Sequence, residues 1–196
     1  MRRLGRGLVA ALTVFLGGCA QWPGFGPAVP GSTLNLAAAP EAFRLEGRVS
    51  VKAGEESFSG GLAWRRTRDG EALLLNTPLG QGVAELHGDP EGVTLTDAKG
   101  KRYRAADADA LVRDALGLEL PLKGLAWWVV GHPRPGAAFR AVADDAGRLA
   151  ALEQDDWRIE FSRYADQGKA TLPGKLVARR GDELEVRLVV DTWELP

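Results

Sequence analysis

The chain has 196 residues, a single cysteine and nearly balanced charge, with 25 lysines and arginines against 26 aspartates and glutamates. This length suits one domain with a sizeable apolar core. One cysteine excludes an intrachain disulfide, so the core must hold the fold together. Near-neutral charge without a basic run argues against a nucleic-acid-binding protein.

The N-terminus has the pattern of a bacterial lipoprotein signal. Arg2, Arg3 and Arg6 precede an apolar stretch at residues 8–16, which is too short for a membrane-spanning helix of about 20 residues. Two glycines then precede Cys19, whose thiol is the predicted site of lipid attachment. An ordinary secretory signal with a chance cysteine is the alternative, but a single leftover cysteine is unusual in a secreted protein.

Three regions follow from this pattern. Residues 1–18 are the predicted signal peptide, and residues 19–41 are the predicted lipidated cysteine with a flexible tether rich in Pro, Gly and Ala. Residues 42–196 are the predicted folded domain. Removing the signal leaves 178 residues and changes the formal charge from −1 to −4. Alanine rather than aspartate at position 20 favours export to the outer membrane of a Gram-negative bacterium.

The domain opens with alternating apolar and polar residues. Residues 43–52 and 57–65 each place one apolar face on a predicted strand. Glycines 47, 60 and 61 lie inside these strands, where glycine marks bends, bulges or close approach of another backbone. We therefore expect a strongly curved sheet.

Residues 71–86 read as a β-hairpin, with two apolar runs joined by a Pro/Gly turn. Pro78 and Gly80 are ordinary turn residues, but Leu79 lies between them at the apex. Leu79 either folds back onto a neighbouring element or is an exposed apolar tip for a membrane or lipid. The hairpin alone leaves both readings open.

Two short helices interrupt the strands. Asp107 is a predicted N-cap for a helix over 108–116, and Gly117 is its predicted stop. Pro121 suits the first position of a second helix over 121–130. Strand patterns resume at 139–143 and continue to Trp193, giving about eleven candidate strands. This order predicts a mainly β (α+β) fold, in which a curved antiparallel sheet forms an incomplete β-barrel lidded by short helices.

Catalytic and metal-binding patterns are weak. His87 and His132 lie far apart in sequence without a cysteine nearby to complete a metal set. The Gly80-Gln81-Gly82 segment lacks the third glycine and the following helix of a dinucleotide site. We therefore expect no enzyme activity, no metal and no cofactor. The six tryptophans either pack the core or line an apolar ligand cavity inside the partial barrel.

In their order along the whole chain, these features resemble the LolB family of outer-membrane lipoprotein receptors. The resemblance is carried by the following residues: the signal ending at Cys19, the opening strand 43–49, residues 58–60 leading to Trp64, the hairpin 73–80, residues 120–122 with Trp128 and Gly131, residues 157–164, residues 172–173 and Trp193. The two glycines before Cys19 depart mildly from the usual alanine or serine.

The resemblance implies a hydrophobic cavity under the helical lid. It also implies that the protein accepts acylated lipoproteins from the periplasmic carrier LolA and inserts them, without ATP, into the inner leaflet of the outer membrane. The family's protruding loop falls on Pro78, Leu79 and Gly80, which favours the exposed reading of Leu79.

We expect the acyl chains to contact five residues from the strands and the lid. These are Leu62, Trp64, Leu125, Trp128 and Val129. The expected partners are the carrier, lipoprotein acyl chains and outer-membrane lipid, and we expect a monomer that faces the periplasm. One alternative is a structural or assembly lipoprotein that uses the sheet as a protein-binding platform. A lipid-modifying hydrolase is a second alternative.

Overall fold

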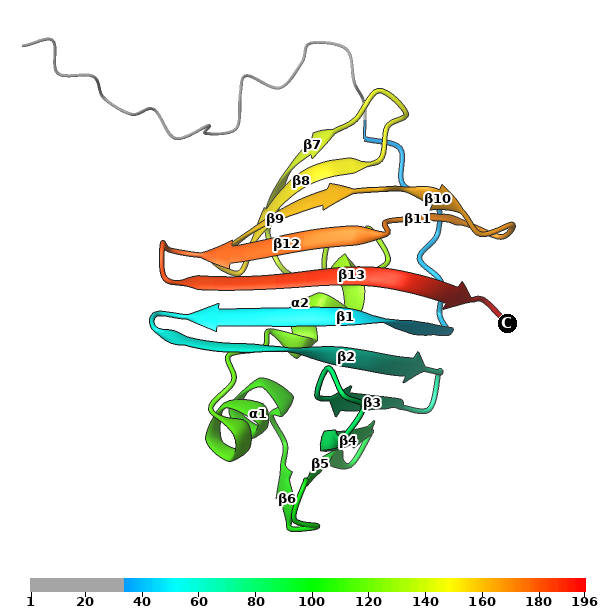
Figure 1. Cartoon of the computed structure of the whole chain (residues 1–196). Coiled ribbons are helices and arrows are strands. Elements are labelled where there is room, and N and C mark those ends of the chain that lie inside the picture. The colour runs from blue at the N-terminus through cyan, green and yellow to red at the C-terminus, as the bar shows by residue number, and fades with distance from the viewer. Residues whose placement is uncertain (1–33) are drawn as a thin grey trace, which may run out of the picture.

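The computed structural model of the chain describes residues 34–196. Its main element is one antiparallel sheet of eleven strands in the order β6-β5-β4-β3-β2-β1-β13-β12-β9-β8-β7. Figure 1 shows the long strands β1 and β13 side by side at the middle of this curved sheet. The first and last long strands of the domain pair here, so the sheet joins the two halves of the chain.

The bounds of the strands follow the alternating patterns closely. In the first half they are β1 (Phe43–Ala53), β2 (Glu56–Arg66), β3 (Glu71–Asn76), β4 (Gly82–Asp89), β5 (Gly92–Asp97) and β6 (Arg102–Ala105). In the second half they are β7 (Phe139–Ala143), β8 (Leu149–Gln154), β9 (Trp157–Ser162), β12 (Lys175–Arg180) and β13 (Leu184–Glu194). A separate two-stranded ribbon, β10 (Ala165–Asp166) with β11 (Thr171–Leu172), has no counterpart among the predicted strands.

The sheet does not close into a barrel, because its edge strands β6 and β7 do not pair with each other. The chain passes from one edge to the other through two helices, α1 (Ala108–Leu116) and α2 (Leu122–Trp128). Both helices lie on one face of the sheet (Figure 1), and α1 packs against β5 and β6. The predicted mainly β fold, with an open sheet and two short helices, is thereby confirmed.

Helix α1 has the predicted bounds. The Asp107 carboxylate accepts a hydrogen bond from the Ala110 backbone N–H at 3.1 Å, and Gly117 ends the helix in the left-handed conformation at φ 68°. The second helix is shorter than the predicted 121–130. Pro121 precedes α2 instead of opening it, because its ψ of 67° is not helical.

The apolar core lies between the sheet and the two helices. In β1 the inward positions Phe43, Leu45, Val49 and Val51 are buried, as their alternation predicts. Gly47 interrupts this series at a β-bulge, where a Cβ atom would lie 2.2 Å from the Val189 carbonyl oxygen of β13. Glycine therefore allows the central strands to approach closely at the bulge.

Glycines 60 and 61 of β2 are adjacent but differ in their surroundings. A Cβ atom at Gly60 would lie 2.0 Å from the Asn76 carbonyl oxygen, whereas one at Gly61 would lie in ordinary contact, 3.8 Å from the Asn76 side chain. We expect Gly60→Ala to lower the free energy of unfolding by about 1–3 kcal/mol, the usual cost of overpacking. Urea denaturation measures this, with Gly61→Ala as the matched control. Equal effects of the two substitutions would contradict this account of β2.

The last residues of the predicted tether lie against the fold. The Asn35 backbone N–H donates to the Gly147 carbonyl at 2.8 Å, and the His132 Nε2 atom lies 2.6 Å from the Ala37 carbonyl oxygen. Leu34 and Leu36 pack on the core. The predicted signal peptide and Cys19 lie outside the described residues.

Candidate functional site

The turn between β3 and β4 holds Leu79 away from the rest of the protein. The turn is closed by two backbone hydrogen bonds, from Thr77 N–H to the Gln81 carbonyl at 2.8 Å and from Gly80 N–H to the Thr77 carbonyl at 2.9 Å. Gly80 adopts φ 82°, which a residue with a side chain rarely takes. Leu79 is 90% exposed, so its side chain does not fold back onto a neighbouring element.

The five residues expected to contact acyl chains come together in the core. Leu62 and Trp64 lie on the inward face of β2, while Leu125, Trp128 and Val129 lie in or just after α2. All five are buried in one apolar cluster. Residues of the sheet and of α2 that are far apart in the chain are thus part of the same core.

A small apolar space lies beneath α1. A space of about 10 Å³ lies between α1 and the strands β3 to β5, close to the smallest volume that holds one water molecule. Its lining consists of Leu73, Leu75, Ala84, Leu86, Leu95, Val112, Leu116, Leu120 and Leu122. None of the five expected contact residues is in this lining. At this space α1 is therefore closed onto the sheet.

Helix α2 is fixed to the sheet by polar contacts at both sides. Arg66, the last residue of β2, donates from Nη1 to the Ala126 carbonyl at 2.7 Å, and its guanidinium lies 4.9 Å from the Trp127 ring centroid. On the other side Trp128 donates from Nε1 to Gln154 Oε1 of β8 at 2.9 Å. The lid helix is thus bonded to strands from both halves of the sheet.

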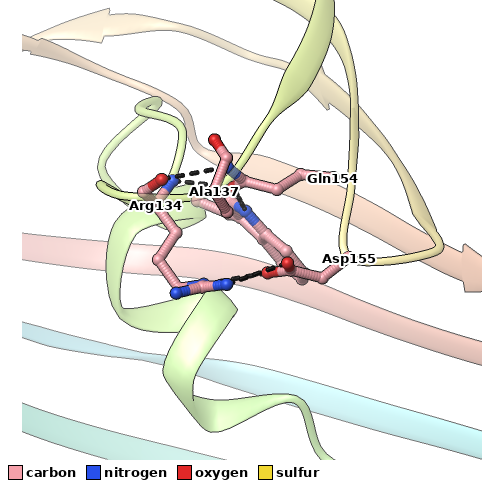
Figure 2. Close-up of polar contacts among 5 residues, drawn as sticks. Arg134, Ala137, Gln154 and Asp155 are labelled. Atoms are coloured by element: carbon pink, nitrogen blue, oxygen red, sulfur yellow. Dashed lines mark hydrogen bonds and ion pairs between the residues drawn. The ribbon is translucent and has the colours of Figure 1, made fainter.

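Gln154 is the one buried polar or charged side chain within residues 34–196. Figure 2 shows it beside the segment that follows α2, where its Oε1 accepts from the Arg134 backbone N–H at 2.7 Å. Its Nε2 donates to the carbonyls of Arg134 and Ala137 at 2.9 and 3.4 Å. With the Trp128 bond, all four hydrogen-bonding positions of the amide are used. The Arg134 guanidinium also pairs with Asp155 through two 2.8 Å bonds (Figure 2).

Helix α1 contacts the sheet through apolar side chains, and its N-terminal carboxylates bond to α2. Leu111 and Val112 of α1 are buried. Asp107 accepts from Lys123 Nζ at 2.5 Å, and Asp109 accepts from the Lys123 backbone N–H at 3.2 Å. Apolar contacts have no fixed direction, so α1 is held to the sheet less specifically than α2.

A partly buried carboxylate lies at the start of β3. Glu71 accepts a hydrogen bond from Trp64 Nε1 at 3.2 Å. Burial raises the pKa of the Glu71 carboxyl above its ordinary value of 4.5, and the Trp64 bond and the charge of Arg66 only partly oppose this. The folded protein therefore binds this proton more strongly than the unfolded chain does, and stability falls as the pH rises above 4.5.

We expect Glu71→Gln to be more stable than the natural chain at neutral pH, because the amide keeps an acceptor for Trp64 without a buried charge. This advantage should disappear below pH 4.5, where the carboxyl is protonated in both states. Urea denaturation across this pH range measures the difference. A constant difference at all pH values would show that the charge of Glu71 is not its cause.

Other polar clusters offer little chemistry. His87 pairs with Glu85 at 2.8 Å on the exposed face of β4. Among residues 34–196 no three His, Cys, Asp or Glu side chains lie close enough together to hold a metal ion. In the same part of the chain, no helix has the length and apolar character needed to cross a membrane.

Solved structures share this architecture. The chain superimposes with a TM-score of 0.53 on a putative outer membrane lipoprotein-sorting protein domain from Vibrio parahaemolyticus, at 12% identity over 78% of this chain and 84% of that one. A DUF1329 family protein from Desulfovibrio piger gives a TM-score of 0.50 at 8% identity, over 80% and 86% of the two chains. At such low identity the likeness defines the fold alone, an open antiparallel sheet covered by helices.

Sequence comparison defines the family. A family model described as outer membrane lipoprotein LolB matches residues 41–193. The outer-membrane lipoprotein LolB of Thiobacillus denitrificans is 41% identical over 194 residues, which cover 99% of this chain and 98% of that protein. The same-named protein of Pseudomonas fluorescens is 39% identical over 154 residues, covering 79% and 75%. The chain belongs to the LolB family.

Sequence reasoning missed two contributors to the site. Gln154 ends a predicted strand and Arg66 directly follows another, so neither stands out from ordinary surface residues in the sequence. The lining of the small space under α1 was missed for a different reason. Its leucines have the same alternation as any buried strand residue, and only the position of α1 distinguishes them.

Proposed function

We propose that this protein is an outer-membrane lipoprotein receptor that takes acylated lipoproteins from a LolA-type periplasmic carrier and inserts them into the inner leaflet of the outer membrane. Membership of the LolB family and the names of its curated relatives support this role. In this role the protein binds its cargo and passes it on without breaking a bond, so no catalytic residue is required.

The observation that carries the proposal is the exposed Leu79 on its fixed turn. In water the Leu79 side chain has no apolar surface to pack against, whereas a bilayer offers it an apolar environment. Pro78, Leu79 and Gly80 form the proposed membrane-inserting tip. Lipid on Cys19 would hold the protein at the membrane, since more than one acyl chain gives stable attachment. The tip would then insert into the bilayer that holds the lipid on Cys19.

The apolar interior supplies the second part of the function. Each CH₂ group buried from water contributes about 0.8 kcal/mol, so acyl chains must remain covered between carrier and membrane. We propose that α1 and α2 move away from the sheet to admit them. Leu62, Trp64, Leu125, Trp128 and Val129 would then exchange contacts with one another for contacts with the chains. Transfer without ATP requires affinity that rises from carrier to receptor to bilayer.

The test follows a fluorescently labelled lipoprotein from the loaded carrier to the purified mature chain with Cys19→Ala, and then into added liposomes. We expect cargo to be isolated with the protein in the first step and to float with the liposomes in the second. Failure to accept cargo from the carrier would refute the proposal. A stable complex with other outer-membrane assembly proteins, without bound lipid, would favour a protein-binding platform instead.

A further inference from the structure

An apolar groove runs along the surface between the end of α1 and the first two strands. Its volume is 470 Å³, and Glu56 is its one charged lining residue. The apolar part of the lining consists of Val51, Ala53, Phe58, Val83, Leu116 and Leu118. Apart from Glu56 and Ser57, no lining residue carries a polar side chain. The groove therefore suits an unbranched apolar chain.

The groove adjoins the space beneath α1 but is separate from it. Leu116, the last residue of α1, lines both of them. Gly117 directly follows at φ 68°, and Leu118 continues along the groove. Since α1 meets the sheet through apolar side chains, a small displacement of its C-terminal end would join the two spaces. Arg180 of β12 donates to the Glu119 carboxylate three residues further on, so the chain after Leu118 stays tied to the sheet.

The other end of the groove lies beside the turn that carries Leu79. Asn76, at the end of β3, pairs with Gly61, so β2 extends beyond β3 by residues 56–60. The turn at residues 77–81 leaves the sheet at this same end, and Val83 of the groove follows directly in β4. Figure 1 shows the β1–β2 connection and α1 at this end of the sheet.

We infer that this groove is the exit route by which a lipoprotein acyl chain passes from the lid interior to the bilayer at Leu79. The inference rests on the proposed function and adds the path to it. A chain that moves past Leu116 onto Phe58 and Val83 stays covered by apolar side chains until it meets the membrane. The exposed turn then serves as the point at which the route reaches lipid.

Photochemical labelling tests the route directly. A synthetic tripalmitoyl lipopeptide with a diazirine in its acyl chains is loaded from the carrier onto the mature Cys19→Ala chain and irradiated before and after liposomes are added. We expect labelled Phe58, Leu116 or Leu118 after contact with liposomes. Labelling confined to other surfaces would overturn the inference. A second experiment uses unlabelled cargo and liposomes that contain a diazirine phospholipid. Labelling of the groove in this experiment would come from membrane lipid that enters it, and not from cargo that leaves through it.

A substitution tests the same route by kinetics. Leu118→Asp places a charge in the groove and should slow release into liposomes about tenfold, because an unpaired charge in an apolar site is unfavourable. Acceptance from the carrier should change less than about twofold, a difference of under 0.5 kcal/mol.

The control is Leu74→Asp, an equivalent change at a 39% exposed leucine on the outer face of β3. Unchanged release, or equal slowing of both steps, would overturn the exit route. If the natural chain accepts no cargo, the proposed function itself fails.

Discussion

Leu79→Glu should slow the insertion of lipoproteins into liposomes at least about tenfold while leaving acceptance from the carrier intact. The Leu79 side chain is 90% exposed and contributes little to the core, so the fold should be unaffected. Transfer of a leucine side chain from water into lipid gains about 1.5–3 kcal/mol. A loss of this size in the rate-limiting step slows insertion roughly ten- to a hundredfold, and the added carboxylate opposes entry into lipid further.

The two steps must be measured separately, because a folding defect would impair both. Leu79→Met keeps an apolar side chain and should retain insertion, while Leu74→Glu adds the same charge on the outer face of β3 and should change neither step. Normal insertion by Leu79→Glu would rule out a membrane role for the turn. Loss of acceptance would instead place Leu79 in the contact with the carrier.

Gln154→Leu should lower the free energy of unfolding by roughly 2 kcal/mol or more. The substitution leaves the Trp128 Nε1–H and the Arg134 backbone N–H without their acceptor, and each buried unsatisfied group costs about 1–3 kcal/mol. Both groups belong to α2 and the segment after it. The lid should therefore loosen before the sheet unfolds.

Urea denaturation measures the stability, and hydrogen exchange of the α2 amides measures the loosening. The control is Gln167→Leu, the same change in the turn between β10 and β11, which should stay within about 0.5 kcal/mol of the natural chain. If the network holds the lid closed, Gln154→Leu should also accept cargo faster. Unchanged exchange in α2 would show that Gln154 stabilises the β8–β9 region alone.

The sequence determined the local elements because each has a short-range physical cause. The alternation in β1 and β13 identifies an inward face, Asp107 and Gly117 delimit α1, and Pro78 with Gly80 produces the turn that exposes Leu79. These features depend on backbone conformation within a few residues. The order of such features along the chain was also sufficient for the resemblance to the LolB family.

Only the tertiary structure decided how the lid is held and what lies beneath it. The bonds from Gln154 to Trp128 and from Arg66 to the Ala126 carbonyl join residues 26 and 60 positions apart. A polar residue at a strand end has the same local pattern whether it faces water or a buried partner. The space near Leu116 likewise depends on how closely α1 approaches the sheet, which is set by packing across the whole core and not by any single stretch of sequence.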